Sequence, residues 1–427
     1  MRFSLTRFGA LGSLKRRAAL PSLSLPAHVN LVFYGNSWIE YYGDLSANTD
    51  ATRISAFALA ALPVGPTYTR VNLGYSGQLA EQLDTDFANR VPAAFDPAAT
   101  MNILAPEAGI NDQGSGRDPI ATYKRRRSIA RKAIALGFKV VDVTIGSRGD
   151  GAAFDSNTYP LTVLDRQLYS TDMGALALAD IAARPEFGTA AAASNLTYYR
   201  ADKLHPSTKG NEVIGKLVIA PAIASIITGA AKRVLGTTYS PVDRSWSLTL
   251  SADNRTVSRP ANTQDNASIK GLPEMQTGKW YWELVRDNTG GNIQLGICNR
   301  AYEDSIVYNN TTLYNDPNAM FVLQGVAVYQ GAQIGPDNPQ AVVNGSVEQY
   351  CLDADARLIW SRIDGGSWNS DPTADPATGK GGRSVAVLGT GPLYPAVTLI
   401  QAPAQITSRF ARAEQTGVLP FGFGTFA

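Results

Sequence analysis

The sequence predicts an α/β three-layer domain followed by an all-β sandwich, and three observations support this. The chain has 427 residues, which is too long for one ordinary core. In residues 29–229, short apolar runs alternate with helical stretches, a pattern typical of a parallel sheet covered on both faces. In residues 244–427, helical periodicity gives way to short alternating runs, typical of a sandwich. We therefore expect a linker at 230–243 and a basic N-terminal arm at 1–28.

The composition narrows the classes of function. Hydrophobic residues make up 44% of the chain and charged residues 17%, which indicates a folded protein rather than a disordered one. Lys and Arg number 38 against 36 Asp and Glu, so no broad basic surface for nucleic acid is expected. Cys298 and Cys351 are too few for a disulfide framework or a four-ligand zinc site, although a single bridge stays open. With only His28 and His205, a multi-histidine metal site is nearly excluded, and no cofactor is expected.

The N-terminal arm is basic and is cut by Pro21 and Pro26, which makes a poor secretory signal. We interpret it as an arm or attachment peptide, with an amphipathic targeting peptide as the alternative. No run of 18 apolar residues occurs, so no membrane partner is expected.

The elements expected in the first domain follow from its apolar periodicity. Strands are expected at Val29–Tyr34, Tyr68–Leu73, Met101–Ala105 and Phe138–Ile145, and helices at Ala51–Leu62, Gln78–Phe87 and Asp118–Leu136. The basic run Lys124-Arg125-Arg126-Arg127 falls in the last of these helices, and we expect it to form the solvated face.

The second domain is expected to be built from short strands around an aromatic core. These strands are Trp246–Leu250, Lys279–Leu284, Ile293–Cys298 and Leu358–Ile363, with a hairpin turn at 364–366. Four tryptophans are interpreted as sandwich core because large aromatic side chains dominate burial: Trp280, Trp282, Trp360 and Trp368.

Four short motifs occur in order in the first domain, near strand ends or before a helix. They are Gly35-Asn36-Ser37, the stretch 72–77 (NLGYSG), Gly109-Ile110-Asn111-Asp112, and Asp202-Lys203-Leu204-His205-Pro206. Sites in parallel sheets form at the carboxyl ends of the strands, so these motifs are expected to converge. Their order and spacing resemble the SGNH (GDSL-like) serine hydrolases, whose domain is flavodoxin-like, over about residues 29–229.

The resemblance implies that Ser37 is the nucleophile, His205 its base and Asp202 the partner of that base. A serine hydroxyl needs a base to remove its proton, and an imidazole does this once a carboxylate holds its tautomer. The resemblance also assigns the oxyanion donors to the backbone N–H groups of Ser37 and Gly77 and to the Asn111 side chain. His28 is the rival base, but no second carboxylate motif accompanies it.

The sequence departs from the family motifs at two positions. Asn36 stands where the family most often has aspartate, and Ile110 stands where a second glycine is frequent. The aspartate does not carry the proton chemistry, so the expected mechanism is unchanged.

Residues from about 246 to 426 resemble a SPRY domain, a β-sandwich used for recognition. The two resemblances together imply an esterase acting on small acyl esters, such as O-acetyl groups on a bacterial surface polysaccharide, without a metal. The combination is similar to phage tail-associated esterases, which implies a virion or extracellular location, other tail proteins as partners and an oligomer as an option. Two alternatives stay open: a secreted lipase or carbohydrate esterase, and a catalytically silent glycan-binding tail protein.

Overall fold

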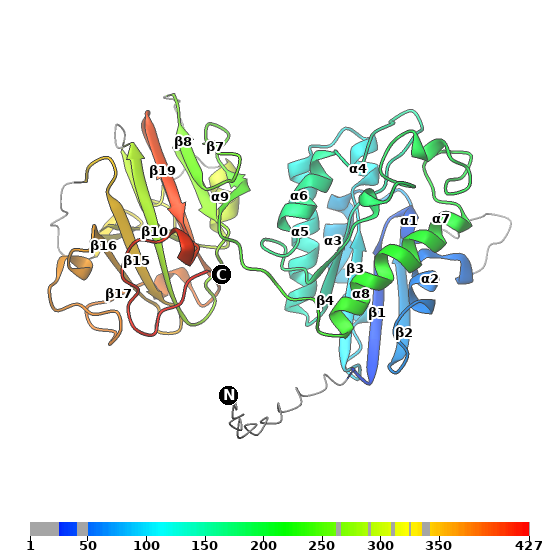
Figure 1. Ribbon diagram of the computed structural model, residues 1–427, viewed down its shortest axis with the longest axis horizontal. Helices are drawn as coiled ribbons and strands as arrows, with labels where there is room; N and C mark the ends of the chain where they lie inside the picture. The colour runs from blue at the N-terminus through cyan, green and yellow to red at the C-terminus, as the bar shows by residue number, and fades with distance from the viewer. Residues whose placement is uncertain are drawn as a thin grey trace, which may run out of the picture.

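The computed structural model describes residues 25–40, 50–261, 266–288, 292–308, 312–323, 326–334 and 342–426. Residues 1–24 of the expected N-terminal arm lie outside the described residues. Figure 1 shows two domains, one built on a parallel sheet with helices on both faces and one built from antiparallel strands.

The first domain has a five-stranded sheet in the order β2-β1-β3-β4-β5, in which each pair of neighbouring strands is parallel. Its strands are β1 His28–Gly35, β2 Thr67–Gly74, β3 Met101–Glu107, β4 Lys139–Val143 and β5 Ala177–Ala179. β1 is buried along nearly its whole length. A central strand between two layers of helices is buried on both faces, and this is why its sequence is a nearly continuous apolar run. The four strands expected from the sequence are present, and the short β5 was not anticipated because three residues carry no periodicity.

Helices cover both faces of this sheet (Figure 1). On one face, α5 contacts both α3 and α6; on the other, α2 packs against the π-helical turn η6, which joins α7 to α8. The α-helices are α1 Ser37–Glu40, α2 Ile54–Ala60, α3 Ala80–Arg90, α4 Ile110–Gly114, α5 Pro119–Ala135, α6 Pro160–Leu168, α7 Thr208–Val213 and α8 Ala220–Ile227. Short turns complete the layer: η2 Asp50–Thr52, η3 Pro92–Ala94, η4 Ile181–Ala183, η5 Ala192–Ser194 and η6 Ile214–Ile219.

The helix that runs continuously through α7, η6 and α8, Thr208–Ile227, has the length and hydrophobicity of a membrane span, but 67% of that window is buried within the protein. Ile214, Ile219 and Ile223 are fully buried in the domain core. Its apolar character is accounted for by packing against the sheet and α2.

The second domain consists of two antiparallel sheets of seven strands each. One has the order β17-β16-β15-β10-β19-β8-β7 and the other β14-β13-β12-β11-β18-β9-β6. The first sheet contains β7 Thr249–Leu250, β8 Thr256–Arg259, β10 Lys279–Asn288, β15 Val347–Asp353, β16 Leu358–Ile363, β17 Arg383–Ser384 and β19 Ala404–Arg409. The second contains β6 Tyr239–Arg244, β9 Ala267–Gly271, β11 Ile293–Asn299, β12 Ala319–Leu323, β13 Val326–Tyr329, β14 Ala332–Ile334 and β18 Leu393–Leu399. The helical pieces are α9 Tyr302–Tyr308, η7 Trp368–Ser370, η8 Ala386–Leu388 and η9 Arg412–Glu414.

Aromatic side chains fill both faces of β10. Trp282 is fully buried and stacks on Tyr350 with ring centroids 5.1 Å apart, in a core that takes residues from both sheets. Tyr281 points to the opposite face, where it joins a smaller cluster with Trp360 and Trp368. Three of the four tryptophans expected in the core are buried, and Trp280 is partly buried against the same core.

Two local expectations in this domain are wrong. The strand expected at Trp246–Leu250 is reduced to β7, because the preceding residues form a turn in which Leu248 N–H donates to Ser245 O and Trp246 is 78% exposed. The turn at 364–366 does form, closed by a bond from Gly366 N–H to Ile363 O. However, it leads into η7 rather than a second strand, so it is no hairpin. β6 also begins inside the segment expected to be a linker.

The two cysteines lie on different sheets, Cys298 on β11 and Cys351 on β15, and both are free and buried. Burial raises the pKa of both thiols. The bridge that the sequence left open does not form.

The expectation of a solvated face for the basic run in α5 is wrong at two of its four positions. Arg126 and Arg127 are buried. Arg126 bonds Asp142 Oδ1 at 2.6 Å and pairs with Asp165 at 2.9 Å inside the first domain. Arg126 and Arg127 are buried in different surroundings, because adjacent residues on a helix point about 100° apart.

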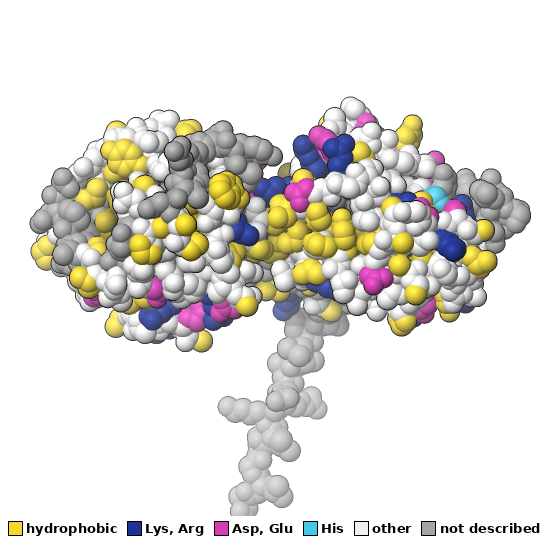
Figure 2. Space-filling model, turned by 90° about the horizontal axis from the view of Figure 1, so that it is seen from above, with side chains coloured by type: hydrophobic (Ala, Val, Ile, Leu, Met, Phe, Trp, Pro, Cys, Tyr) yellow, Lys and Arg dark blue, Asp and Glu magenta, His cyan; other side chains and the backbone are white. Residues whose placement is uncertain are grey.

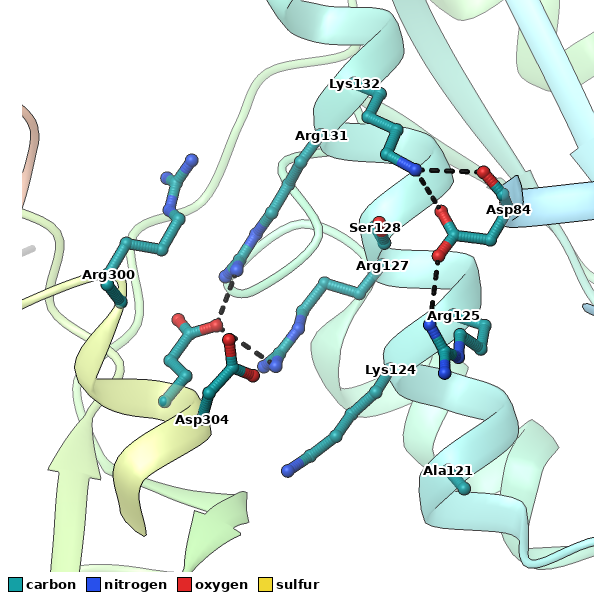
Figure 3. A pocket seen from close by; sticks show the side chains of 12 residues that line it. Asp84, Ala121, Lys124, Arg125, Arg127, Ser128, Arg131, Lys132, Arg300 and Asp304 are labelled. Carbon is teal, nitrogen blue, oxygen red and sulfur yellow. Dashed lines mark hydrogen bonds and ion pairs between the residues drawn. The ribbon is translucent and has the colours of Figure 1, made fainter. Parts of the chain in front are cut away.

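Arg127 crosses to the second domain, and Figure 3 shows it converging with Arg131 on the side chains of α9. Its guanidinium bonds both oxygens of Asp243 at 2.7 and 3.0 Å and pairs with Glu303 at 3.1 Å. Asp172 from the first domain and Lys270 from β9 complete a buried cluster of three cations and three carboxylates. The cluster of Arg127, Arg131, Lys270, Asp172, Asp243 and Glu303 is called here the junction cluster. Figure 2 shows the two lobes in contact at this junction.

Candidate active site

The candidate site lies at the carboxyl end of the parallel sheet, where the first three motifs follow β1, β2 and β3. Parallel strands bring the residues after them to one edge of the sheet. Gly35 pairs with Gly74 of β2 and with Glu107 of β3, so the loops carrying Ser37, Gly77 and Asn111 leave the sheet side by side. The fourth motif reaches this edge from the loop that precedes α7.

Ser37 is the first residue of the short helix α1. Asn36 caps this helix, because its side-chain oxygen accepts from Trp38 N–H at 3.0 Å and its carbonyl accepts from Ile39 N–H at 3.1 Å. The Trp38 ring is buried against Phe187 and Tyr199. Ser37 is therefore held on a turn whose ends are both fixed, and only 3% of it is exposed.

Asp202 and His205 form a local unit within one tight turn. The Asp202 carboxylate accepts from the backbone N–H groups of Leu204 and His205, each at 2.9 Å, and its second oxygen lies 2.8 Å from His205 Nδ1. Lys203 between them has a left-handed backbone with a φ of 57°. Arg200 N–H donates to His205 O at 2.8 Å and closes the turn.

The structure brings this unit to Ser37. His205 Nε2 lies 3.0 Å from Ser37 Oγ, across a sequence separation of 168 residues. Because Nδ1 faces a carboxylate, it carries the proton, and Nε2 is left as the acceptor for the serine hydroxyl. Ser37, His205 and Asp202 thus form one continuous hydrogen-bonded chain.

The electrostatics of this chain suit a neutral imidazole. Burial lowers the pKa of His205, and the positive charges of Arg200 and Arg148 lower it further, against the opposing effect of Asp202. Burial acts to raise the pKa of Asp202, but the hydrogen bonds from His205 and Leu204 outweigh it and keep that pKa below its usual range. The carboxylate is therefore ionised and the imidazole neutral near pH 7, so His205 can accept a proton.

Gly77 and Asn111 lie together beside this chain. The Asn111 side-chain amide donates to Gln78 O at 2.9 Å, which places it next to the Gln78–Leu79 peptide, one residue beyond Gly77. Gly77 has a φ of 76°, while a Cβ there would meet nothing within 4 Å, so its backbone conformation rather than lack of space requires glycine. Glu40 of α1 fixes the same loop by accepting from Ser76 N–H at 2.5 Å.

A pocket of about 400 Å³ opens beside these residues. Its lining comprises Gly77, Leu79, Gln82, Asn111, Gly114, Ser115 and Arg148. Arg148 belongs to none of the four sequence motifs, although it follows β4 toward the same edge of the sheet, and that position after a predicted strand is a usable signal. Its guanidinium donates to Ile110 O at 3.3 Å and pairs with Asp150.

His28, the rival base, lies at the opposite end of β1 from Ser37. Its Nε2 is 3.2 Å from Thr69 Oγ1, and its Nδ1 is 3.7 Å from Asp96. No serine motif comes to that end of the sheet among the described residues, so His28 does not belong to the site.

The largest pocket described, of about 690 Å³, lies at the domain junction and not at Ser37 (Figure 3). Asp172, Asp243 and Glu303 lie close enough together there to hold a metal ion. They are already neutralised by the three cations of the junction cluster, with contacts such as Lys270 Nζ–Glu303 Oε1 at 2.6 Å. The donor set therefore fits a balanced ion network better than a metal.

Comparisons with solved structures find similar folds for parts of the chain. A lipolytic protein of the G-D-S-L family from Veillonella parvula is 16% identical and matches 46% of this chain and 96% of its own, with a TM-score of 0.33. A GDSL-like lipase from Bacteroides thetaiotaomicron is 17% identical and matches 47% and 88%, with a TM-score of 0.32. The SPRY domain of human HERC1 is 11% identical and matches 40% and 96%, with a TM-score of 0.30. No family model and no curated protein matches the sequence.

Proposed function

We propose that this protein is a serine ester hydrolase with Ser37 as nucleophile. The observation that carries the proposal is the chain from Ser37 Oγ to His205 Nε2 at 3.0 Å and from His205 Nδ1 to Asp202 at 2.8 Å. A nucleophile, a neutral base and a carboxylate that orients the base are the groups that acyl transfer needs.

In the proposed reaction, Ser37 Oγ attacks the acyl carbon while His205 Nε2 takes the serine proton. Asp202 stabilises the imidazolium that forms. The oxyanion receives hydrogen bonds from the Ser37 and Gly77 N–H groups and the Asn111 amide. The leaving alcohol then takes the proton from His205, which leaves an acyl-enzyme on Ser37. Water, deprotonated by His205, attacks this ester; the bond from the acyl carbon to Ser37 Oγ breaks, His205 returns the proton to Ser37 Oγ, and the carboxylic acid is released.

The test is hydrolysis of p-nitrophenyl acetate by the full chain and by Ser37→Ala. We expect the variant to fall to the background rate with an unchanged melting temperature. Ser194→Ala, an exposed serine, is the matched control for acylation of surface groups. A fluorophosphonate should label the wild type at Ser37, located by mass spectrometry. Equal turnover by wild type and Ser37→Ala would refute the proposal.

The finer proposal is that the ester is an O-acetyl group on a bacterial surface polysaccharide and that the sandwich is a SPRY-like module that binds glycan or protein. It is supported by motif order and by the pairing of an α/β domain with a β-sandwich. Release of acetate from O-acetylated polysaccharide, followed by NMR, tests the substrate. A silent glycan-binding protein would instead bind the polysaccharide without releasing acetate.

A further inference from the structure

Beneath the candidate nucleophile lies a buried carboxyl group that the proposed reaction does not use. Glu107 ends β3 and is 1% exposed. Neither of its side-chain oxygens has a hydrogen-bond partner among the described residues. An unpaired buried carboxylate is costly, so its presence at this position calls for a function.

The amide that faces it belongs to Asn36, the residue before Ser37. β1 and β3 run side by side with Gly35 opposite Glu107, and a Cβ at Gly35 would clash with the Glu107 carbonyl oxygen. The Asn36 Nδ2 group is fully buried and has no partner within hydrogen-bond distance in the described part of the chain. A donor without an acceptor, just after the end of β1, and an acceptor without a donor, at the end of β3, therefore lie at the ends of two adjacent strands.

The surroundings favour an interaction between these two groups. Burial raises the pKa of Glu107 to about 7, whereas the Arg126 charge and the polar Asn36 amide act to lower it and the Asp112 charge acts to raise it. Arg126 is already committed to Asp142 and Asp165. Asp112 accepts from Ala80 N–H at 2.9 Å. The Asn36 amide is thus the group left to satisfy Glu107.

We propose that Glu107 is a positioning residue for Ser37, acting through a hydrogen bond from the Asn36 amide. The other end of the Asn36 side chain holds the first turn of α1 by accepting from Trp38 N–H. Fixing the amide therefore fixes the turn that carries Ser37 Oγ. This inference rests on the proposed esterase function.

The same pairing accounts for asparagine at the position where aspartate is frequent in the family that the motifs resemble. Aspartate at position 36 would put two carboxyl groups together in a buried site where the neighbouring cation, Arg126, is already paired with Asp142 and Asp165, and one of the two would have to stay protonated. Asparagine offers the carboxyl of Glu107 a donor instead.

The experiment compares Glu107→Leu, Glu107→Gln, Asn36→Asp and the swap Asn36→Asp/Glu107→Gln by p-nitrophenyl acetate kinetics and melting temperature. Glu107→Leu should lower kcat about tenfold with little change in KM, corresponding to one misplaced hydrogen bond. Glu107→Gln should stay within about threefold of wild type, because its carbonyl still accepts from Asn36.

Asn36→Asp should lose about tenfold in kcat/KM above pH 7, and the loss should shrink at lower pH as one carboxyl takes up a proton. The swap restores one amide and one carboxyl and should recover most of that loss. Asn30→Asp, at the other end of β1, is the matched control. Asn30 is buried and donates to Asn102 Oδ1 at 2.8 Å. Any activity that Asn30→Asp loses should therefore not be regained by adding Glu107→Gln.

The outcomes separate the two proposals. A wild type without activity overturns the esterase, while the melting temperatures of the swap cycle still test the pair. If the wild type is active but the effects of Asn36→Asp and Glu107→Gln simply add in the double variant, the role of Glu107 is overturned and the esterase proposal stands. Full activity in Glu107→Leu would have the same meaning.

Discussion

Replacing Arg127 by methionine tests whether the junction cluster joins the two domains. Arg127 pairs with Asp172 at 2.9 Å, Asp243 at 2.7 Å and Glu303 at 3.1 Å, and it is 5% exposed. Methionine fills similar space but leaves the three carboxylates facing two buried cations, Arg131 and Lys270, and the partly exposed Lys124, whose Nζ lies 3.7 Å from Asp243 Oδ1. The buried charges are then no longer balanced, and removing one partner of a buried pair costs about 3–5 kcal/mol.

For domains of this size, 1 kcal/mol shifts the melting temperature by ~2–4 °C, so we expect a fall of about 6–20 °C. The assay is differential scanning calorimetry, in which loss of coupling should also separate the transitions of the two domains. The matched control is Arg125→Met, two positions earlier on α5, where the side chain is 48% exposed and pairs with Glu81 and Asp84. Exposed pairs contribute about 0–1 kcal/mol.

A further variant, Arg127→Met/Asp243→Asn, removes one charge of each sign. It should regain a large part of the lost stability, because the negative charge left behind by the first substitution is gone. If Arg127→Met melts within about 4 °C of Arg125→Met, the junction cluster does not hold the domains together and the reasoning is refuted.

Three further predictions concern the site. Asn111→Ala should lower kcat for p-nitrophenyl acetate by about 10²–10³-fold if its amide binds the oxyanion, and unchanged kcat would remove it from that role. Arg200→Gln removes a charge that lowers the pKa of His205. Because the neutral imidazole is the active form, activity is lost as pH falls through that pKa. The acid limb of kcat/KM should therefore move to higher pH in Arg200→Gln but not in Lys203→Gln, and a shift in both or neither contradicts this. Gly77→Ala should cost roughly 1–2 kcal/mol in stability from its left-handed backbone alone, measured by urea unfolding; an unchanged midpoint would show that the loop adapts.

The sequence predicts the fold class well where periodicity is long. β1 and α5 are examples, because a buried strand needs a continuous apolar run and a surface helix needs a repeating stripe. It fails where tertiary contacts override the local pattern. Arg127 lies in a run that looks solvated, yet it is neutralised by Asp243, 116 residues away, and no local signal reports such a partner.

The candidate site could be predicted in part, because its residues either lie close together in the sequence or follow predicted strands. Asp202 and His205 are neighbours in sequence, and Ser37, Gly77 and Asn111 each follow a predicted strand, so topology alone brings them to one edge. Arg148 and Glu107 belong to no motif. Their placement beside the site depends on the ends and register of β4 and β3, and strand ends are where sequence patterns are least informative.

The turn that pairs Asp202 with His205 has a consequence for how activity arises during folding. These two residues are three positions apart in the sequence, so closing that loop is fast and entropically cheap, whereas the contact with Ser37 spans 168 positions. The contact between Asp202 and His205 is local in sequence, whereas the contact between His205 and Ser37 is a long-range contact of the kind that forms slowly. Recovery of hydrolysis after dilution from denaturant would therefore follow the docking of the loop that precedes α7 against α1, which places the appearance of activity late in folding.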